Sequence, residues 1–544
     1  MKEKIVLIAL FCLFSLNGKA QTIACNDNSY IHISDNSFVS THTFLNQNNA
    51  KLSFGSGQLK VDGDFTNNGI ISCGLGTFIF ESPNPQNISM SGVDQLYHLK
   101  IGENTIYSIN SNDKKTIQGH LSNNGNFVIK SNAAGDGSLI TNTISGSGTY
   151  KVERYLAANK WHLVSSPITN AFSGVFTGIW LRPYNESTNQ FGAYIVPTTI
   201  PMNVGQGFSN WTYNNETRTF SGIVNNGTVG PIHLPRTNLG WNLIGNPYPS
   251  AIDWNAVIGW TKTNVANSVY VWNGNLGQYA TYIGGIANNG GSQYIPMGQG
   301  FFVQALAGGG NISMNNNVRV HSSVAFMKTE DPANIIRIKV ATAESSDESV
   351  IAVRSSVMDE FDYQFDAAKL RGDASVPQLY TKKADTEAAI CAYNDIFKIY
   401  GQFVYLEPAS SSEHVLLYSH TLDGTDVPVL FDHITGAVIY PNIPYTFMPN
   451  ASNIVKRFEF IKTSPTTINE SNSGSIMAWE SKGILNIENL ENQILKEIRV
   501  FDMQGKLVFV ANENYCNVNH LTRGIYMLMV STDKRVEFKK IFKQ

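Results

Sequence analysis

The densest group of residues that could do chemistry is a run of four acids: Asp359, Glu360, Asp362 and Asp366. Two carboxylates at a suitable separation are enough for glycoside hydrolysis, and several carboxylate oxygens together could hold calcium. The spacing is not that of an EF-hand loop, and acids on a strand alternate between its two faces. We therefore interpret the run as a solvated edge or turn. A polysaccharide hydrolase with unidentified carboxylates stays an alternative.

The other motifs of catalysis are missing from the sequence. It contains no G-x-S-x-G nucleophile turn, no H-E-x-x-H zinc motif and no glycine-rich phosphate or dinucleotide loop. His414, His420 and His433 are not spaced as a catalytic set. Asp62 and Asp64 could open a calcium loop, but we interpret them as turn residues. We expect no catalytic residues, no cofactor, no metal site and hence no enzyme activity.

Tryptophan is concentrated in one part of the chain, since seven of the eight lie between residues 161 and 272. Aromatic rings can stack on the apolar faces of sugars, and Trp and Tyr are enriched at binding surfaces. Trp161 and Trp241 lie in duplicated apolar runs, so we expect them in cores. Trp211, Trp254 and Trp260, flanked by Asn, Asp or Thr, are the candidate glycan contacts.

Almost all of the 544-residue chain after residue 21 reads as short strands separated by turns. Short alternating runs, such as those at 78–80, 127–129 and 336–340, are punctuated by Gly, Asn and Pro. Helical periodicity is scarce, and the best helix candidate is the short segment 386–393. The pattern predicts an all-β fold, and the length predicts several domains.

Residues 21–150 carry a weak internal repeat. The sequence Gly-Asp-Phe-Thr-Asn-Asn-Gly at 63–69 returns as Gly-His-Leu-Ser-Asn-Asn-Gly at 119–125, 56 residues later. That interval would hold two or three coils of a β-solenoid, with the Asn-Asn-Gly turns stacked at its corners. We therefore predict a β-solenoid-like region.

Residues 151–325 contain a clearer duplication. The segment Trp-His-Leu-Val-Ser-Ser-Pro at 161–167 returns as Trp-Asn-Leu-Ile-Gly-Asn-Pro at 241–247. Each copy later reaches a Gly-Gln-Gly-Phe turn, at 205–208 and 298–301. Matching blocks in the same order predict tandem β-modules at about 155–235 and 236–325.

Two further β-rich units follow. Turn spacing over 328–465 suits a β-sandwich, and the Ser/Thr/Asn-rich stretch 463–475 has the composition of an exposed linker. Residues 476–544 alternate with a period of two between polar turns, which predicts a small antiparallel, Ig-like sandwich.

The first twenty residues read as a secretory signal peptide. Positive residues precede an apolar run over 5–16, and Gly18 and Ala20 supply the small residues of a cleavage site. The run is too short to span a bilayer, and no later stretch suits a transmembrane segment. Without residues 1–20 the net charge is −5 and no basic run exists, so we expect no nucleic-acid partner.

Four cysteines follow the signal peptide: Cys25, Cys73, Cys391 and Cys516. They form no C-x-x-C pair, which argues against a zinc site or a disulfide scaffold. A bridge between Cys25 and Cys73 stays open as an alternative to unpaired buried thiols.

Three sequence blocks follow one another in the last seventy residues. They are Val500-Phe501-Asp502-x-x-Gly505-Lys506, Leu521-x-x-Gly524-Ile525-Tyr526 and Lys539-Lys540-Ile541-Phe542-Lys543. In these blocks the segment resembles the C-terminal sorting domain, of the type A kind, of proteins exported by the type IX secretion system of Bacteroidetes. The resemblance marks a sorting motif of Asp502, Gly505, Lys506, Leu521, Gly524, Ile525, Tyr526, Lys540 and Lys543.

This resemblance implies a route and a destination. The signal peptide would take the chain to the periplasm, and the outer-membrane secretion machinery would read the folded terminal domain. After a cut in the 463–475 linker, the body would be released or attached to surface lipopolysaccharide. We therefore expect a non-catalytic surface or secreted protein, serving in adhesion or glycan binding, with a hydrolase or a structural spacer as alternatives.

Overall fold

The computed structural model describes residues 22–26, 28–322, 333–408, 412–423, 427–449, 456–462, 476–481, 483–489, 494–502, 506–533 and 536–543. The regular structure in these ranges is β-strand apart from three short 3-10 turns, which confirms the all-β, multidomain prediction. The turns are Ser173–Phe176, Asn316–Val318 and Ile396–Lys398. The chain forms two compact units, one from residues up to 330 with 363–370, the other from 331–362 with 371 onward.

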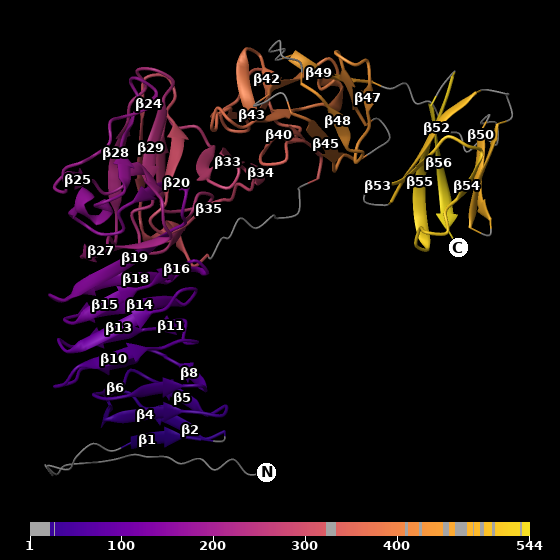
Figure 1. The fold of residues 1–544 in the computed structure, drawn as a ribbon. Coiled ribbons are helices and arrows are strands. Elements are labelled where there is room, and N and C mark those ends of the chain that lie inside the picture. Colours follow the sequence, from indigo (N-terminus) through magenta and orange to yellow (C-terminus); the bar gives the residue numbers. More distant parts are fainter. Residues whose placement is uncertain are drawn as a thin grey trace, which may run out of the picture. The chain divides into compact units, whose positions relative to one another are not determined.

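A β-solenoid forms the N-terminal part of the first unit, as predicted (Figure 1). On one face Phe38 pairs in parallel with Gln58, Gln58 with Thr77 and Thr77 with His98, so successive coils are offset by 20, 19 and 21 residues. Alternate side chains of each strand point into the coil. Its strands are β1 Thr22–Cys25, β2 Tyr30–Ile33, β3 Phe38–Thr41, β4 Thr43–Asn46, β5 Lys51–Phe54, β6 Gln58–Val61, β7 Phe65–Asn67, β8 Ile70–Ser72, β9 Thr77–Phe80, β10 Gln86–Ser89, β11 Gln95–Leu96, β12 His98–Ile101, β13 Thr105–Ile109, β14 Lys114–Asn123, β15 Asn126–Ile129, β16 Ser131–Asn132, β17 Gly135–Asp136 and β18 Ser138–Ser145.

The two Asn-Asn-Gly turns do not stack on each other, so that part of the prediction is wrong. Asn67 ends β7 and lies over Asn46 of β4, with Asn46 Nδ2 2.7 Å from Asn67 Oδ1. Asn123 ends β14 on another face, opposite Ile101 of β12. The 56-residue interval is not a whole number of coils, and the repeated sequence therefore returns at a different corner.

The last solenoid face continues directly into the first tandem module. β19 (Thr149–Leu156) pairs in parallel with β15 and antiparallel with β27 (Glu216–Gly222) of the module. One sheet, in the order β10-β13-β15-β19-β27, therefore belongs to both parts. This pairing covers an edge that an open solenoid would leave exposed.

The two modules repeat the same pairing. In each, the strand that begins near the duplicated Trp (β20 or β29) pairs antiparallel with the strand that follows the Gly-Gln turn (β26 or β36). The remaining strands of the modules are β21 Ala171–Phe172, β22 Trp180–Arg182, β23 Tyr184–Asn185, β24 Gln190–Phe191, β25 Pro201–Met202, β28 Val229–Leu234, β30 Ala251–Asp253, β31 Trp260–Thr263, β32 Val269–Asn273, β33 Gln278–Ile283, β34 Ile286–Asn288, β35 Tyr294–Ile295, β37 Gly310–Met314 and β38 Arg319–Val320. The four strands first mentioned are β20 Lys160–Ser165, β26 Gly207–Thr212, β29 Trp241–Gly245 and β36 Gly300–Gln304.

The two modules meet through equivalent contacts, as two halves of an isologous interface do. These contacts are the backbone bridges Val164–Gln299 and Ile244–Gln206. A Cβ atom on Gly207 would lie 2.5 Å from Ile244 O, and one on Gly300 would lie 3.1 Å from Val164 N. The duplicated Gly-Gln-Gly turn therefore serves the close approach of the two backbones.

The second unit begins with a large sheet in the order β47-β46-β49-β44-β42-β43-β40-β39-β45-β48. Ile439 of β47 and Phe447 of β48, from opposite ends of this order, belong to one hydrophobic core. The sheet therefore folds over onto itself, as in a sandwich. Its strands are β39 Ile335–Ala341, β40 Ser346–Val353, β42 Gln378–Lys383, β43 Thr386–Tyr393, β44 Phe403–Glu407, β45 His414–His420, β46 Val429–Asp432, β47 Val438–Ile439, β48 Tyr445–Phe447 and β49 Lys456–Ile461, while β41 Ala367–Ala368 lies in the segment that belongs to the first unit.

The helix candidate at 386–393 is wrong, because this segment is strand β43. It pairs in parallel with β40 and antiparallel with β42, deep inside the sheet. Residues 388–393 are buried on both faces. A strand buried on both faces shows no period-two alternation, which is why the sequence pattern was ambiguous.

The C-terminal residues form a separate two-layer sandwich, as predicted. Its sheets, in the orders β50-β51-β54 and β53-β52-β55-β56, are antiparallel throughout. Leu485, Val500 and Leu528 lie in a core distinct from that of the preceding domain. Its strands are β50 Ile476–Ser481, β51 Ile484–Asn489, β52 Leu495–Phe501, β53 Leu507–Ala511, β54 Tyr515–Asn517, β55 Gly524–Thr532 and β56 Val536–Lys543.

The four cysteines after the signal peptide are free thiols, so the Cys25–Cys73 bridge is not formed. Burial raises the pKa of Cys25 to about 11 and that of Cys73 to about 12. Both thiols therefore stay protonated at neutral pH, where the thiolate would be the reactive form.

Candidate functional site

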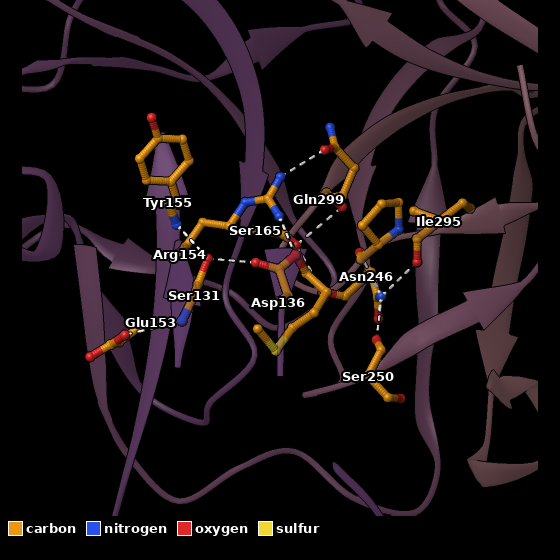
Figure 2. Close-up of polar contacts among 12 residues, drawn as sticks. Ser131, Asp136, Glu153, Arg154, Tyr155, Ser165, Asn246, Ser250, Ile295 and Gln299 are labelled. Carbon is orange, nitrogen blue, oxygen red and sulfur yellow. Dashed lines mark hydrogen bonds and ion pairs between the residues drawn. The ribbon is translucent and has the colours of Figure 1, made fainter. Parts of the chain in front are cut away.

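A partly buried polar cluster holds the end of the solenoid against the second module (Figure 2). Arg154 of β19 donates to Asp136 Oδ2 at 2.9 Å, to Gln299 Oε1 at 3.1 Å and to the Met297 carbonyl at 3.1 Å. Asp136 also accepts from Ser131 Oγ at 2.5 Å. The charges are matched and hydrogen-bonded, as buried ions require, so the cluster is structural.

Asn246 and Ser165, from the two copies of the duplicated block, extend this cluster. Asn246 Nδ2 donates to the carbonyls of Ser250 at 2.8 Å and Ile295 at 3.1 Å (Figure 2). Ser165 Oγ, from the equivalent block of the first module, donates to the Asn246 carbonyl at 2.8 Å. The block therefore satisfies buried backbone groups at the junction of the modules.

A broad groove of about 1450 Å³ lies along the two modules and the last solenoid coil. Its lining is mainly apolar but includes the amide side chains of Asn142, Asn185, Asn203 and Asn226. Amides offer both donors and acceptors without charge, which suits the hydroxyl groups of a sugar.

A row of three tryptophans crosses the sheet of the first module. Trp161 of β20 faces Trp211 of β26, which in turn faces Trp180 of β22. Opposed residues of antiparallel strands project from the same face. The ring centroids of Trp161 and Trp211 are 5.4 Å apart.

Two tyrosines extend this row at the surface. Tyr194 lies with its ring centroid 4.8 Å from that of Trp180, and Trp180 Nε1 donates to Tyr213 Oη at 3.4 Å. Trp180 is 42% exposed, Tyr194 45% and Tyr213 62%. We call Trp161, Trp180, Tyr194, Trp211 and Tyr213 the aromatic platform.

Of the three candidate glycan contacts, Trp211 alone belongs to the platform. Trp254 is 1% exposed and donates from Nε1 to the Asn267 carbonyl at 2.7 Å, which corrects the expectation that it is a contact. Trp260 is half-buried against Trp254 and donates to the Asp253 carbonyl at 2.8 Å. Polar neighbours in the sequence did not reveal these side-chain directions, because strand residues next to one another point to opposite faces.

The duplicated tryptophans have different surroundings. Trp241 is buried, as expected, against the edge of Tyr270. Trp161 is half-buried in the platform, contrary to expectation. The sequence reasoning also missed Trp180, Tyr194 and Tyr213, whose common face depends on pairing between distant strands.

Three of the acids and histidines considered above are engaged in local contacts. Asp359 pairs with Lys398, and His42 Nδ1 lies 2.8 Å from Asp62 Oδ1. His433 pairs with a carboxylate at 2.7 Å. Across the described ranges, no group of three or more His, Cys, Asp or Glu side chains could hold a metal ion.

The sorting motif forms turns and strand starts of the terminal sandwich. Asp502 Oδ1 accepts from the Lys506 amide at 2.9 Å, while Gly505 between them lies outside the described residues. Leu521 closes a turn, and Gly524, Ile525 and Tyr526 begin β55. Tyr526 Oη donates back to the Thr522 carbonyl at 2.8 Å.

The two motif lysines of β56 differ in their surroundings. Lys540 is exposed. Lys543 is buried, with Nζ 3.8 Å from Glu480 Oε1 of β50. Lys543 therefore ties the two sheets together, whereas Lys540 stays accessible to a partner.

Two family models match the chain. Residues 76–461, more than half of its length, match the family described as "Domain of unknown function (DUF8693)". The chain belongs to this family. Residues 481–544 match the secretion system C-terminal sorting domain. No curated protein matches the chain.

The sorting domain establishes the destination of this DUF8693 protein. It is exported by type IX secretion to the cell surface or the extracellular space, and the outer-membrane secretion machinery is its partner. None of the helices in the described ranges is long and apolar enough to cross a membrane. The expected signal peptide (1–20) and linker (463–475) lie outside the described residues.

Proposed function

We propose that the protein is a non-catalytic glycan-binding protein of the cell surface or the extracellular medium, serving in adhesion. The observation that carries this proposal is the aromatic platform, in which Trp161, Trp211 and Trp180 stand on one sheet face. Large aromatic side chains gathered at a surface are typical of binding sites. The family itself has no assigned activity, so the proposal rests on this geometry.

The platform has the properties that stacking on a sugar requires. Trp180 and Tyr194 form a tilted pair, and both side chains are exposed where a ligand can reach them. The C–H face of a sugar ring is apolar and can be buried on such rings. The amide side chains in the groove on the same unit offer further partners for hydroxyl groups.

The contacts of two of the candidate acids favour a non-catalytic role over a hydrolase. Asp359 and Asp62, from the acidic segments, are in ion pairs or hydrogen bonds with basic side chains. A glycosidase needs two free carboxyl groups on either side of the scissile bond. Incubation with a panel of polysaccharides should therefore release no reducing ends.

A glycan array probed with the full chain tests the proposal, followed by titration calorimetry on the best glycan. Trp180→Ala should weaken binding at least about tenfold, the loss expected for a residue that dominates a small interface. Trp479→Ala is the matched control, since Trp479 is also 42% exposed but lies in the sorting domain. Absence of binding across the array, or equal binding by wild type and Trp180→Ala, would overturn the proposal and favour a spacer.

A further inference from the structure

We infer that the platform selects anionic glycans, and that the Arg182 guanidinium binds a carboxylate or sulfate group on the sugar. This inference rests on the proposed function and names the class of ligand. The first evidence for it is the position of Arg182 on β22. Arg182 lies two residues beyond Trp180, on the same face of the strand.

The guanidinium of Arg182 is held between aromatic rings. Its Cζ atom lies 4.2 Å from the ring centroid of Trp161 and 4.6 Å from that of Phe191. Tyr194 connects it to the exposed part of the platform, at 5.7 Å from Cζ and 4.8 Å from the Trp180 ring. Ring stacking orients the planar group by its faces and leaves its N–H edges free to donate.

Arg182 has no anionic partner in the described part of the chain. Its side chain donates no hydrogen bond there, and its Nε is buried without an acceptor. Other arginines with low exposure have hydrogen-bond acceptors: Arg154 pairs with Asp136 at 2.9 Å, Arg457 pairs with Asp432 at 2.7 Å, and buried Arg319 donates to backbone carbonyl and amide oxygens. Arg182 differs from these arginines because its half-buried guanidinium has neither a counter-charge nor a hydrogen-bond acceptor in the described residues.

The electrostatic surroundings of Arg182 favour the binding of an anion. Burial lowers its pKa, and the titratable groups that act on it are the hydroxyls of Tyr194 and Tyr279. Burial of a charge is unfavourable unless the charge is paired. A carboxylate or sulfate can pair with the guanidinium through two parallel hydrogen bonds while its sugar ring stacks on Trp180.

Matched polymers with and without charge test this inference on the full chain. We would use polygalacturonate against its methyl ester, and dextran sulfate against dextran, in affinity gel electrophoresis at low salt. The wild type should bind at least one charged polymer about tenfold more tightly than its neutral counterpart. Added salt should weaken this preference.

Arg182→Gln should abolish the preference for charge, and Arg182→Lys should restore only part of it, because lysine lacks the planar fork. Arg523→Gln, the same change at an exposed arginine of the sorting domain, should keep the preference. Thermal unfolding would confirm that each variant is folded.

The outcomes separate this inference from the proposed function. If the wild type binds neutral and charged polymers equally, or if Arg182→Gln keeps the preference, the anion site is refuted while glycan binding stands. If binding to charged polymers is insensitive to both Arg182→Gln and Trp180→Ala, it occurs elsewhere and both ideas fail.

Discussion

Buried ionisable residues connect parts of the first unit that are far apart in the sequence. His321, after the second module, has Nε2 2.8 Å from Thr116 Oγ1 and Nδ1 2.8 Å from Ser138 Oγ, both on solenoid strands. Burial lowers the pKa of His321 to about 4, and Lys114 and Arg319 add to the effect. The imidazole is therefore neutral in the folded protein at neutral pH.

The stability of the first unit should depend on this histidine in acid. Between pH 6.5 and 4 the unfolded chain binds a proton at His321 that the folded chain excludes, so stability falls as pH falls. The neutral variant His321→Gln should remove roughly 2 kcal/mol of this loss. Urea unfolding at pH 7 and pH 4 measures the difference, and parallel pH profiles for wild type and variant would contradict it.

The stability of the second unit should depend on one buried ion pair. Arg457 and Asp432 are 2% and 0% exposed, with Arg457 Nη2 2.7 Å from Asp432 Oδ2. Asp432→Asn should destabilise this domain by about 3 kcal/mol, because it leaves a buried guanidinium without its counter-charge. Pulse proteolysis in urea measures the change. Lys398→Gln, which removes a surface pair, should change stability by less than about 1 kcal/mol and serves as control.

At the scale of elements, the duplicated blocks are now explained by the junction that they form. Val164 and Ile244 occupy equivalent places in the two modules, and each bridges the glutamine of the other module's Gly-Gln-Gly turn. The turn is preserved because both copies must pass close to a neighbouring backbone. Repetition in the sequence thus reflects a symmetric contact rather than a repeated binding site.

Gly207→Ala should weaken the junction of the modules. Its Cβ would lie 2.5 Å from Ile244 O and 2.8 Å from Leu243 Cγ, so the backbones must separate. We expect a loss of about 2 kcal/mol, measured by urea unfolding. Gly524→Ala, where a Cβ meets no atom within 4 Å, should have little effect; equal losses would show that close approach is not the reason.

The sequence predicted those elements whose pattern of apolar and polar residues lies within one continuous segment. Strand alternation identified β9, β15 and β39, and the duplicated blocks correspond to equivalent strand pairs, β20–β26 and β29–β36. It misread β43 as a helix because that strand is buried on both faces. It missed most of the platform because Trp161, Trp180 and Trp211 come together only through strand pairing.

At the scale of the whole molecule, the terminal sandwich has its own core and its own sheets, as a separately recognised sorting signal requires. The sequence predicted this domain and its route, because the motif residues are close in the chain. It did not reveal the ligand, because the candidate site is built from side chains of distant strands.

Deletion of residues 476–544 should leave the protein in the periplasm, since the secretion machinery would have no domain to read. Protease treatment of intact cells, followed by fractionation, measures where the chain lies. A control variant with Lys51→Gln, at an exposed lysine of the solenoid, should be displayed as the wild type is. Normal surface display of the truncated chain would contradict the sorting assignment.

The strand shared by the solenoid and the first module has a mechanical consequence. The coils lie on one side of the β19–β27 ladder and the first module, with its platform, on the other, so a force that pulls the platform away from the coils would act across this ladder. The ladder runs from Tyr150–Gly222 to Leu156–Glu216. Tension directed along β19 would strain all the hydrogen bonds between β19 and β27 at the same time. Strands pulled past each other in this way separate at a higher force than strands whose hydrogen bonds break one pair after another.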